Sequence, residues 1–334
     1  MTTITLADLQ TSVRDRSAFG ELGHYFTLCH AFLRLIEETQ PTRIISPTHH
    51  NYVFYQYDEA HGHRITRPLN TNLFLESAND FKIAFERFVA FLTDLKKFQE
   101  AVIDQDTERG YLDSKEINKV VYTVQQSVGS IGDSFDNPNQ SRKRVGQLFE
   151  NLIKLIIQEV GLECESRRVK VPIPGYPGYA MSYDLDLVFS RGQAIVASET
   201  ELIHPAEVVG SVKTTSKDRI DKVFLDKYLL TQFLGREVQV IAIFLHDVQR
   251  ARRGHSIFGI NSTFKSNHFM GYMVALNRLD GVYYVDPHPK MIADERLREE
   301  ISDFQHFLTH DLWVLSQVVG QYSIADRKEF IAGE

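Results

Sequence analysis

The run EVQVIAIFLHDV at residues 237–248 constrains the fold more than any other stretch of the chain. It is strongly apolar and β-branched, which is typical of an interior strand that is covered on both faces. A helical pattern precedes it at residues 216–235, and another β-type segment, VYYVDP, follows at 282–287. This alternation of helices and strands predicts an α/β core, because an interior strand needs other elements above and below it.

The rest of the chain divides at a loop with turn residues and a proline, SFDNPNQS at 134–141. Before it, the pattern predicts a mostly helical part with two helices and a hairpin between them. After it, a clear amphipathic helix ends at Gly161, and a longer helix that contains Trp313 is expected near the end. The expected helices are 20–41, 78–102 (capped by Asn79 or Asp80), 142–161 and about 291–318, and the hairpin falls within 43–75.

Composition excludes several classes of protein. The chain has 334 residues with 43% hydrophobic residues, which is ordinary for a globular protein, and no apolar run long enough for a membrane span. The start lacks the features of a secretion signal, and the sparse cysteines, Cys29 and Cys164, favour a reducing compartment, so a cytoplasmic protein is expected. The net charge of −7 means that any contact with nucleic acid needs a local basic surface.

Two aspartates begin a predicted strand, SYDLDLVFS, at residues 182–190. Asp184 and Asp186 are two positions apart, so a strand would place them on the same face. Aspartates rarely begin a buried strand unless something binds them, and their hard oxygen atoms suit Mg²⁺. The alternative is a strand end that reaches solvent, where paired carboxylates have no function.

The segment EVVGSVK at 207–213 predicts the next strand, with Ser211 and Lys213 on the same face. A lysine near a metal-bound water can steer or activate that water while the metal stabilises charge on a phosphate. This chemistry usually needs two carboxylates near the cation, and Ser211 stands where the second would be convenient.

Asp226, on the helix expected at 216–235, is a candidate for the missing carboxylate. It lies among leucines and aromatic residues, where an aspartate costs free energy unless it is paired or metal-bound. Lys222, one helical turn earlier, has the spacing of an ion-pair partner. The residues alone leave both roles open.

Together these segments resemble the PD-(D/E)xK nuclease fold, and are similar to the restriction endonucleases of the CCGG-core family. In that family a serine replaces the acidic residue of the (D/E)xK triplet, and the next helix supplies the carboxylate. The family pattern is lysine, three residues, Arg-(Asp/Glu)-Arg, six residues and a carboxylate. This sequence has Lys213-TTS-Lys217-Asp218-Arg219-IDKVFL-Asp226. It departs in having lysine for the first arginine, aspartate for the usual glutamate, and no proline before the strand aspartates.

The resemblance covers about residues 140–247 and implies a homodimeric, Mg²⁺-dependent type II restriction endonuclease that cuts double-stranded DNA. The implied fold is a restriction-endonuclease-like α/β core, a central mixed sheet flanked by helices, at residues 136–334. A helix-rich region at 1–135 would serve DNA contact or dimerisation. The implied site comprises Asp186 and Asp226 as metal ligands, Asp184 as a second-choice ligand, Lys213 to position water, Ser211 at the vacated position, Glu150 as an outer carboxylate, and Lys217, Asp218 and Arg219 in the major groove.

The implied base readout follows from the edges of a G·C pair. Asp218 can accept from cytosine N4, while Arg219 and Lys217 can donate to guanine O6 and N7, which favours a palindromic site with a CCGG or CCNGG core. Lysine cannot form the planar pair of hydrogen bonds that arginine gives to guanine, so Lys217 weakens the case for strict recognition of the base sequence. Two other functions stay open: a structure-specific or repair nuclease of the same fold, and a non-catalytic DNA-binding module.

Four histidines, in THHN at 48–51 and HGH at 61–63, are a further candidate cluster. No cysteine partner lies near them, so DNA contact from a loop fits them better than a zinc site.

Overall fold

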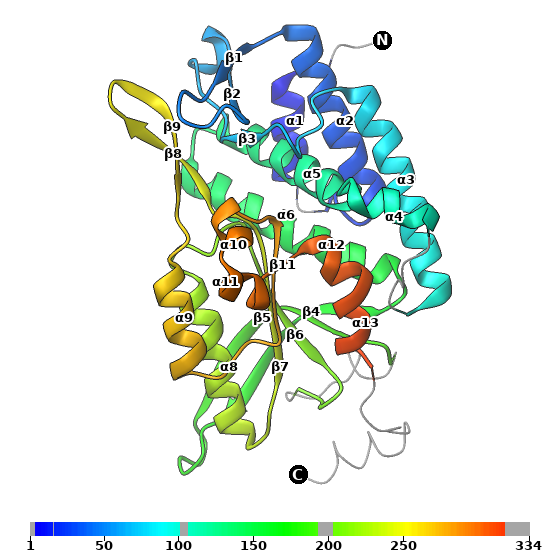
Figure 1. The fold of residues 1–334 in the computed structure, drawn as a ribbon, viewed down its shortest axis with the longest axis vertical. Coiled ribbons are helices and arrows are strands. Elements are labelled where there is room, and N and C mark those ends of the chain that lie inside the picture. Colours follow the sequence, from blue (N-terminus) through cyan, green and yellow to red (C-terminus); the bar gives the residue numbers. More distant parts are fainter. Residues whose placement is uncertain (1–3, 16, 101–105, 193–202, 318–334) are drawn as a thin grey trace.

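The computed structural model describes residues 4–15, 17–100, 106–192 and 203–317. Within these ranges, six strands form the central sheet: β4 (Glu163–Pro172), β5 (Ala180–Ser190), β6 (Val208–Lys213), β7 (Gln239–His246), β10 (Gly281–Asp286) and β11 (Ser302–Asp303). Their order is β11-β10-β7-β6-β5-β4 (Figure 1). Neighbours from β4 to β6 are antiparallel, and neighbours from β6 to β11 are parallel, so the sheet is mixed.

Strand β7 is buried on both faces, as its apolar sequence predicts. Ile241, Ile243 and Leu245 belong to one hydrophobic core, while Ala242 and Phe244 belong to another on the opposite face. Helices α8 (Ile220–Leu234) and α9 (Ser266–Ala275) cover the second face, and α6 (Pro138–Glu159) contributes to the core on the first (Figure 1). The predicted α/β core, with a central mixed sheet flanked by helices, is therefore confirmed.

Helix α6 begins earlier than its apolar pattern suggested. Asn137 caps it by accepting hydrogen bonds from the backbone N–H groups of Asn139 and Gln140, and Pro138 occupies its first turn. The predicted loop at 134–141 is thus a shorter turn. The buried stripe of α6, which includes Leu152 and Ile156, packs in the same core as the N-terminal helices. The division into regions 1–135 and 136–334 stays a prediction.

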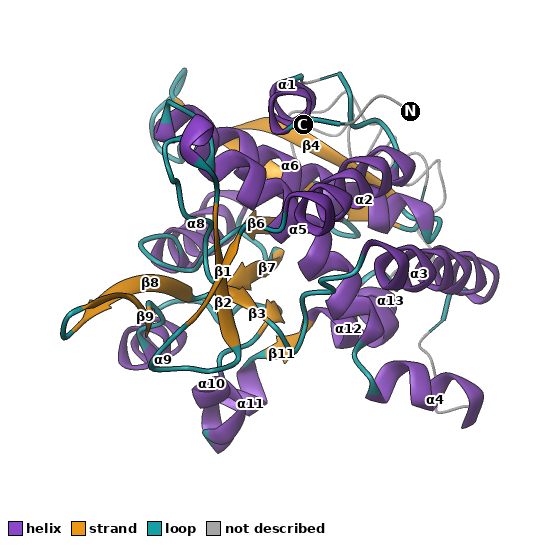
Figure 2. Cartoon of the chain, turned by 90° about the horizontal axis from the view of Figure 1, so that it is seen from above, coloured by secondary structure: helices purple, strands orange, loops and turns teal. Residues whose placement is uncertain are grey.

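The N-terminal region is rich in helices, which stack beyond α6 at one end of the molecule (Figures 1 and 2). Ser77, rather than Asn79 or Asp80, caps the second predicted helix, since its side chain accepts from the backbone N–H of Asp80. The N-terminal helices are α1 (Leu6–Arg14), α2 (Leu22–Thr39), α3 (Ala78–Phe98), α4 (Asp106–Asp113) and α5 (Glu116–Asp133).

Helix α5 was not expected from the sequence. Nearly every residue from Ile117 to Gly132 is buried, so the helix has no solvent face to produce an amphipathic pattern. Polar residues are buried with it; Thr123, for example, donates its hydroxyl to the backbone carbonyl of Leu73 and accepts from the backbone N–H of Leu75. When polar and apolar residues are buried alike, the sequence shows no helical period of hydrophobicity, and the helix is not recognised from it.

Two small sheets lie side by side (Figure 2), and both lie above the central sheet in the view of Figure 1. The first contains the hairpin of β1 (Thr42–Ile45) and β2 (Tyr52–Gln56), followed by β3 (Leu69–Asn70). THHN forms the β1–β2 turn, and HGH begins with the last residue of a short 3₁₀ helix (Glu59–His61) and continues into the turn that follows. The second is the hairpin of β8 (Val248–Arg253) and β9 (Ser256–Ser262), which projects from the body and exposes Arg250 and Arg252.

The single helix predicted over about 291–318 is wrong. The chain instead forms separate short elements, because Asp294 and Asp303 each cap a new helix and thereby end the preceding element. Trp313 is buried in the core and donates Nε1–H to the carbonyl of Leu308 at 2.9 Å. The elements around β11 are α10 (Pro289–Ala293), α11 (Glu295–Glu300), α12 (Phe304–His306), a π-helical turn (Phe307–Asp311) and α13 (Leu312–Leu315).

Two further features complete the description. The segment AIVAS at residues 194–198, whose composition favours an extended conformation, lies outside the described residues. None of the helices in the described ranges is long and apolar enough to cross a membrane.

Asp286, at the end of β10, links the central sheet to the first small sheet. It is buried, and Asn70 of β3 donates Nδ2–H to its Oδ1 at 3.0 Å. Burial raises the pKa of Asp286 from the ordinary 3.8 to about 7. Between about pH 4 and pH 7 the folded chain therefore holds a proton that the unfolded chain releases, so this group lowers stability as pH rises through that window.

We expect Asp286→Asn to remove this part of the pH dependence. From pH 4 to pH 8 the variant should gain stability relative to the wild type by roughly a few kcal/mol, because one pKa unit corresponds to about 1.4 kcal/mol. Urea unfolding at several pH values measures the difference, with the exposed Asp113→Asn as the control that keeps the wild-type slope. Parallel curves for the wild type and Asp286→Asn would contradict the prediction.

Candidate active site

The site begins where β5 and β6 part. The ladder between these strands ends at the pair Leu187–Gly210. Just beyond this pair, the Asp186 carboxylate accepts a hydrogen bond from the backbone N–H of Val212, at 2.9 Å. The Ser211 hydroxyl donates to the same oxygen of Asp186 at 3.3 Å. The position that the sequence marked as a vacated carboxylate therefore helps to hold the aspartate opposite.

Lys213 joins two carboxylates from different elements. Its Nζ donates to Oε1 of Glu150, on α6, at 3.0 Å, and also to Oδ2 of Asp186, on β5. Burial alone would lower the pKa of Lys213, but Asp186 and Glu150 outweigh burial and raise it, so the ammonium form is favoured. Burial and the charge of Asp186 raise the pKa of Glu150, against the opposing effect of Lys213.

Asp226 of α8 faces the same space. It lines a cavity of about 170 Å³ together with Asp186 and Lys213. Its carboxylate forms an ion pair of 3.3 Å with Lys222, which is the alternative partner that the sequence offered. Burial, with a smaller effect from the charge of Asp186, nonetheless raises the pKa of Asp226 above its usual value, and Lys222 opposes this shift. The side chain of Lys222 is 72% exposed, so this pair is of the weakly stabilising surface kind.

Asp184 lies on the same face of β5 but further out. Its side chain is 75% exposed and pairs with Arg168 at 2.5 Å. The hydrogen bond from Arg168 lowers the pKa of Asp184. Asp184 lines the cavity, but its exposure and its arginine partner make it a weaker candidate ligand than Asp186.

The segment from Lys217 to Arg219 connects β6 to α8 and is exposed. Arg219 is the N-cap residue of α8 and lines the same cavity as Lys213. Lys217 and Asp218 line a second cavity of about 180 Å³, beside Lys265 and His268. Residues 217–219 thus lie directly beside Lys213 and its two carboxylate partners, as their spacing in the sequence requires.

Asp247 holds this segment in place, and the sequence reasoning missed it. It is fully buried directly after β7, and its carboxylate accepts from the backbone N–H and hydroxyl of Ser216, the hydroxyls of Thr215 and Thr263, and the phenol of Tyr284. Two of these residues immediately precede Lys217. The available signal was an aspartate just after a run of apolar strand residues, 240–245, where a buried carboxylate must be bound by something.

We expect Asp247→Ala to destabilise the fold by about 3–5 kcal/mol, because it leaves buried donors without an acceptor. Urea unfolding monitored by circular dichroism measures the loss. Glu299→Ala, at an exposed position of α11, is the matched control and should change stability little. A loss no larger than that of the control would show that the donors find other partners.

Comparison with solved structures defines the fold class. The chain resembles the crystal structure of the type IIP restriction endonuclease Kpn2I with a TM-score of 0.68 and 16% sequence identity, over 94% of this chain and 98% of that one. The restriction endonuclease PspGI in complex with substrate DNA gives a TM-score of 0.38 and 13% identity, over 71% and 91%, which is too distant to support an argument. No model of a known protein family and no curated protein matches the sequence.

The likeness to Kpn2I confirms the predicted restriction-endonuclease-like fold. It also extends well beyond residues 140–247, the part that the sequence motifs covered, and takes in most of the helix-rich N-terminal region. At this level of identity the likeness establishes the fold, and the chemistry must be argued from the site itself.

Proposed function

We propose that this protein is a type II restriction endonuclease that hydrolyses double-stranded DNA with Mg²⁺ at a short palindromic site with a CCGG or CCNGG core. The observation that carries the proposal is the position of Lys213, bonded to both Asp186 and Glu150, on a cavity that Asp226 also lines. Carboxylates around a lysine at the end of a strand, on a fold shared with a restriction endonuclease, suit phosphodiester hydrolysis.

The donor set fits a hard divalent cation. Asp186 and Asp226 would hold Mg²⁺, since both offer carboxylate oxygens to one cavity and their side chains are only 16% and 29% exposed. Burial raises the pKa of both Glu150 and Asp226, and the charge of Asp186 adds to each shift; this added effect is like-charge repulsion that a cation would relieve. Bound there, the ion would stabilise negative charge on the scissile phosphate.

Lys213 would act as a positively charged group rather than as a base, because the raised pKa keeps its proton on Nζ. An ammonium donor at this point can orient the attacking water and stabilise charge that builds on the phosphate. Glu150 and Asp186 fix the direction of Nζ. Cleavage would leave a 5′-phosphate and a 3′-hydroxyl.

The exposed Lys217–Arg219 segment would read bases in the major groove. Arg219 can donate two parallel hydrogen bonds to guanine, and Asp218 can accept one from cytosine N4. Lys217 can also donate hydrogen bonds to guanine, but from a compact ammonium group that lacks the planar two-pronged geometry of arginine. A palindromic site requires a two-fold symmetric reader, so the active form would be a homodimer.

One observation favours a second candidate, a DNA-binding module that lacks the chemistry. The ion pair between Lys222 and Asp226 has the form that a purely structural role would take. The two candidates differ in whether Asp226 is needed for more than this pair.

The direct test is cleavage of plasmid DNA of known sequence, with Mg²⁺ or with EDTA. We expect discrete fragments only with Mg²⁺, and sequencing of the ends gives the recognition site. A ladder of products would favour a structure-specific or repair nuclease, and intact plasmid across several DNAs would reject the nuclease proposal.

Variants of the site test the roles within it. Lys213→Ala and Asp226→Asn should each lower the cleavage rate by about 10²–10⁴-fold, the range for a charge-stabilising group. Lys222→Ala is the matched control because it breaks the same ion pair and leaves the Asp226 carboxylate, so it should retain near wild-type activity. Equal losses in Asp226→Asn and Lys222→Ala would assign Asp226 to the ion pair.

Recognition is tested by binding without cleavage. In Ca²⁺, Arg219→Ala should weaken binding to the cleaved site by about 1–3 kcal/mol and leave binding to unrelated DNA nearly unchanged. Fluorescence anisotropy with both DNAs measures the ratio, and the exposed Arg296→Ala of α11 is the charge-matched control. An equal loss on both DNAs would assign Arg219 to phosphate contact instead.

A further inference from the structure

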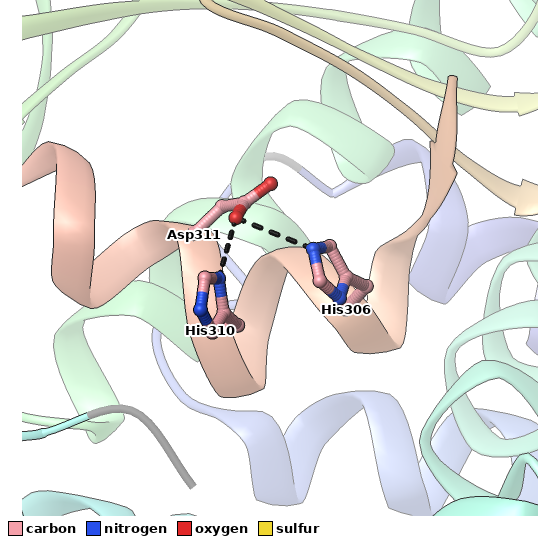
Figure 3. A group of neighbouring side chains, drawn as sticks. All are labelled: His306, His310 and Asp311. Carbon is pink, nitrogen blue, oxygen red and sulfur yellow. Dashed lines mark hydrogen bonds and ion pairs between the residues drawn. The ribbon is translucent and has the colours of Figure 1, made fainter. Parts of the chain in front are cut away.

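Near the end of the described chain, two histidines and an aspartate converge on one another (Figure 3). His306 ends α12, and His310 and Asp311 belong to the π-helical turn that follows. Oδ1 of Asp311 lies 2.7 Å from Nδ1 of His310 and 3.3 Å from Nε2 of His306. Among the described residues, these three offer ligand atoms that all lie within 4.8 Å of one another.

The π-helical turn creates this cluster. In a regular α-helix His306 and His310 would share a face, but Asp311, five positions after His306, would point about 140° away from it around the axis. A π turn bonds residues five apart and so brings Asp311 back alongside His306. Such turns are rare and frequently occur at functional sites.

The rings and the carboxylate are held in orientations that suit a shared ligand. The two imidazoles stack with their centroids 5.1 Å apart and their planes 19° from parallel, and ring nitrogens of both face Oδ1 of Asp311. On the other side, the buried Tyr283 of β10 donates its hydroxyl to Oδ2 of Asp311 at 2.8 Å. A hydrogen bond of this kind to a carboxylate is what orients a metal ligand in many proteins.

We propose that His306, His310 and Asp311 form a binding site for a late divalent transition metal, with Zn²⁺ as the representative ion. Two imidazoles and one carboxylate suit Zn²⁺, Ni²⁺ or Cu²⁺ rather than Mg²⁺, which prefers oxygen ligands only. A tetrahedral Zn²⁺ separates its ligand atoms by about 3.3 Å, from bonds of about 2.0–2.1 Å. The His306–Asp311 separation matches this value, the His310–Asp311 separation is shorter at 2.7 Å, and the ligand atoms of the three residues all lie within 4.8 Å of one another.

This site is independent of the nuclease proposal. It lies on other elements than the Lys213 cavity and calls for a different class of cation. Both histidine side chains are about half exposed, so an ion can reach them, whereas the neighbouring Phe307 and Leu308 are buried in the core. Metal bound here would stabilise the π-helical turn and, with it, the packing of residues 304–315.

Zinc binding by the full-length, metal-stripped protein tests the proposal. The protein is dialysed against Zn²⁺ with excess Mg²⁺ present to occupy carboxylate sites, and bound zinc is measured by atomic emission. The wild type should bind one Zn²⁺ per chain more than the double variant His306→Ala/His310→Ala. Zinc should also raise the melting temperature of the wild type and leave that of the double variant unchanged.

The matched control is His49→Ala/His50→Ala, which removes an exposed histidine pair from the β1–β2 turn and should bind zinc as the wild type does. Tyr283→Phe keeps the buried ring and removes only its hydroxyl, and should weaken zinc binding about 10–100-fold. Equal zinc content in the wild type and the histidine double variant would overturn the proposal and leave the cluster as an ion pair only.

Discussion

The interior strands β7 and β10 of the central sheet are buried on both faces, and this constraint decides where chemistry can lie in the molecule. Strand β7 sends alternate side chains into two separate hydrophobic cores, and an unpaired charge in either would cost several kcal/mol. Polar groups therefore collect where strands end or part. Lys213 ends β6, Asp186 occupies the point where β5 and β6 separate, and Asp247 directly follows β7.

The cluster around Lys213 draws on both helical layers. Glu150 comes from α6, whose buried residues belong to the core on one face, and Asp226 comes from α8, whose buried residues belong to the core on the other. They can approach the same lysine or cavity only at the end of a strand, where the sheet no longer separates the layers. The geometry of the cluster therefore depends on correct packing of both cores, so a packing defect in either layer would move one of its carboxylates.

Sequence patterns located the elements with a clear period and missed those whose form depends on tertiary contacts. The amphipathic α6 and the apolar β7 were predictable because each has one dominant pattern. Helix α5 was not, since burial on all sides removes the contrast between faces. The C-terminal helix was overextended because Asp294 and Asp303 act as caps, which cannot be distinguished by sequence alone from aspartates on a helix surface.

The same distinction holds for the site. Asp186, Lys213 and Asp226 were predicted together because strand alternation, and the resemblance to the family pattern that follows the lysine, both depend on local sequence. Asp247 was missed because its partners come from three segments that only the fold assembles. The histidine cluster was missed for another reason: regular helical spacing separates His306 from Asp311, and only the π turn brings them together.

The two roles considered for Asp226 do not exclude each other. Lys222 pairs with it, yet the pKa of Asp226 is raised, so burial and repulsion from Asp186 outweigh the attraction of the lysine. The carboxylate is thus held where its charge is unfavourable, with a largely exposed partner that is easily displaced. A purely structural pair would gain more from a bidentate partner such as arginine. An unfavourable charge beside a cavity supports the proposal that a cation completes the site.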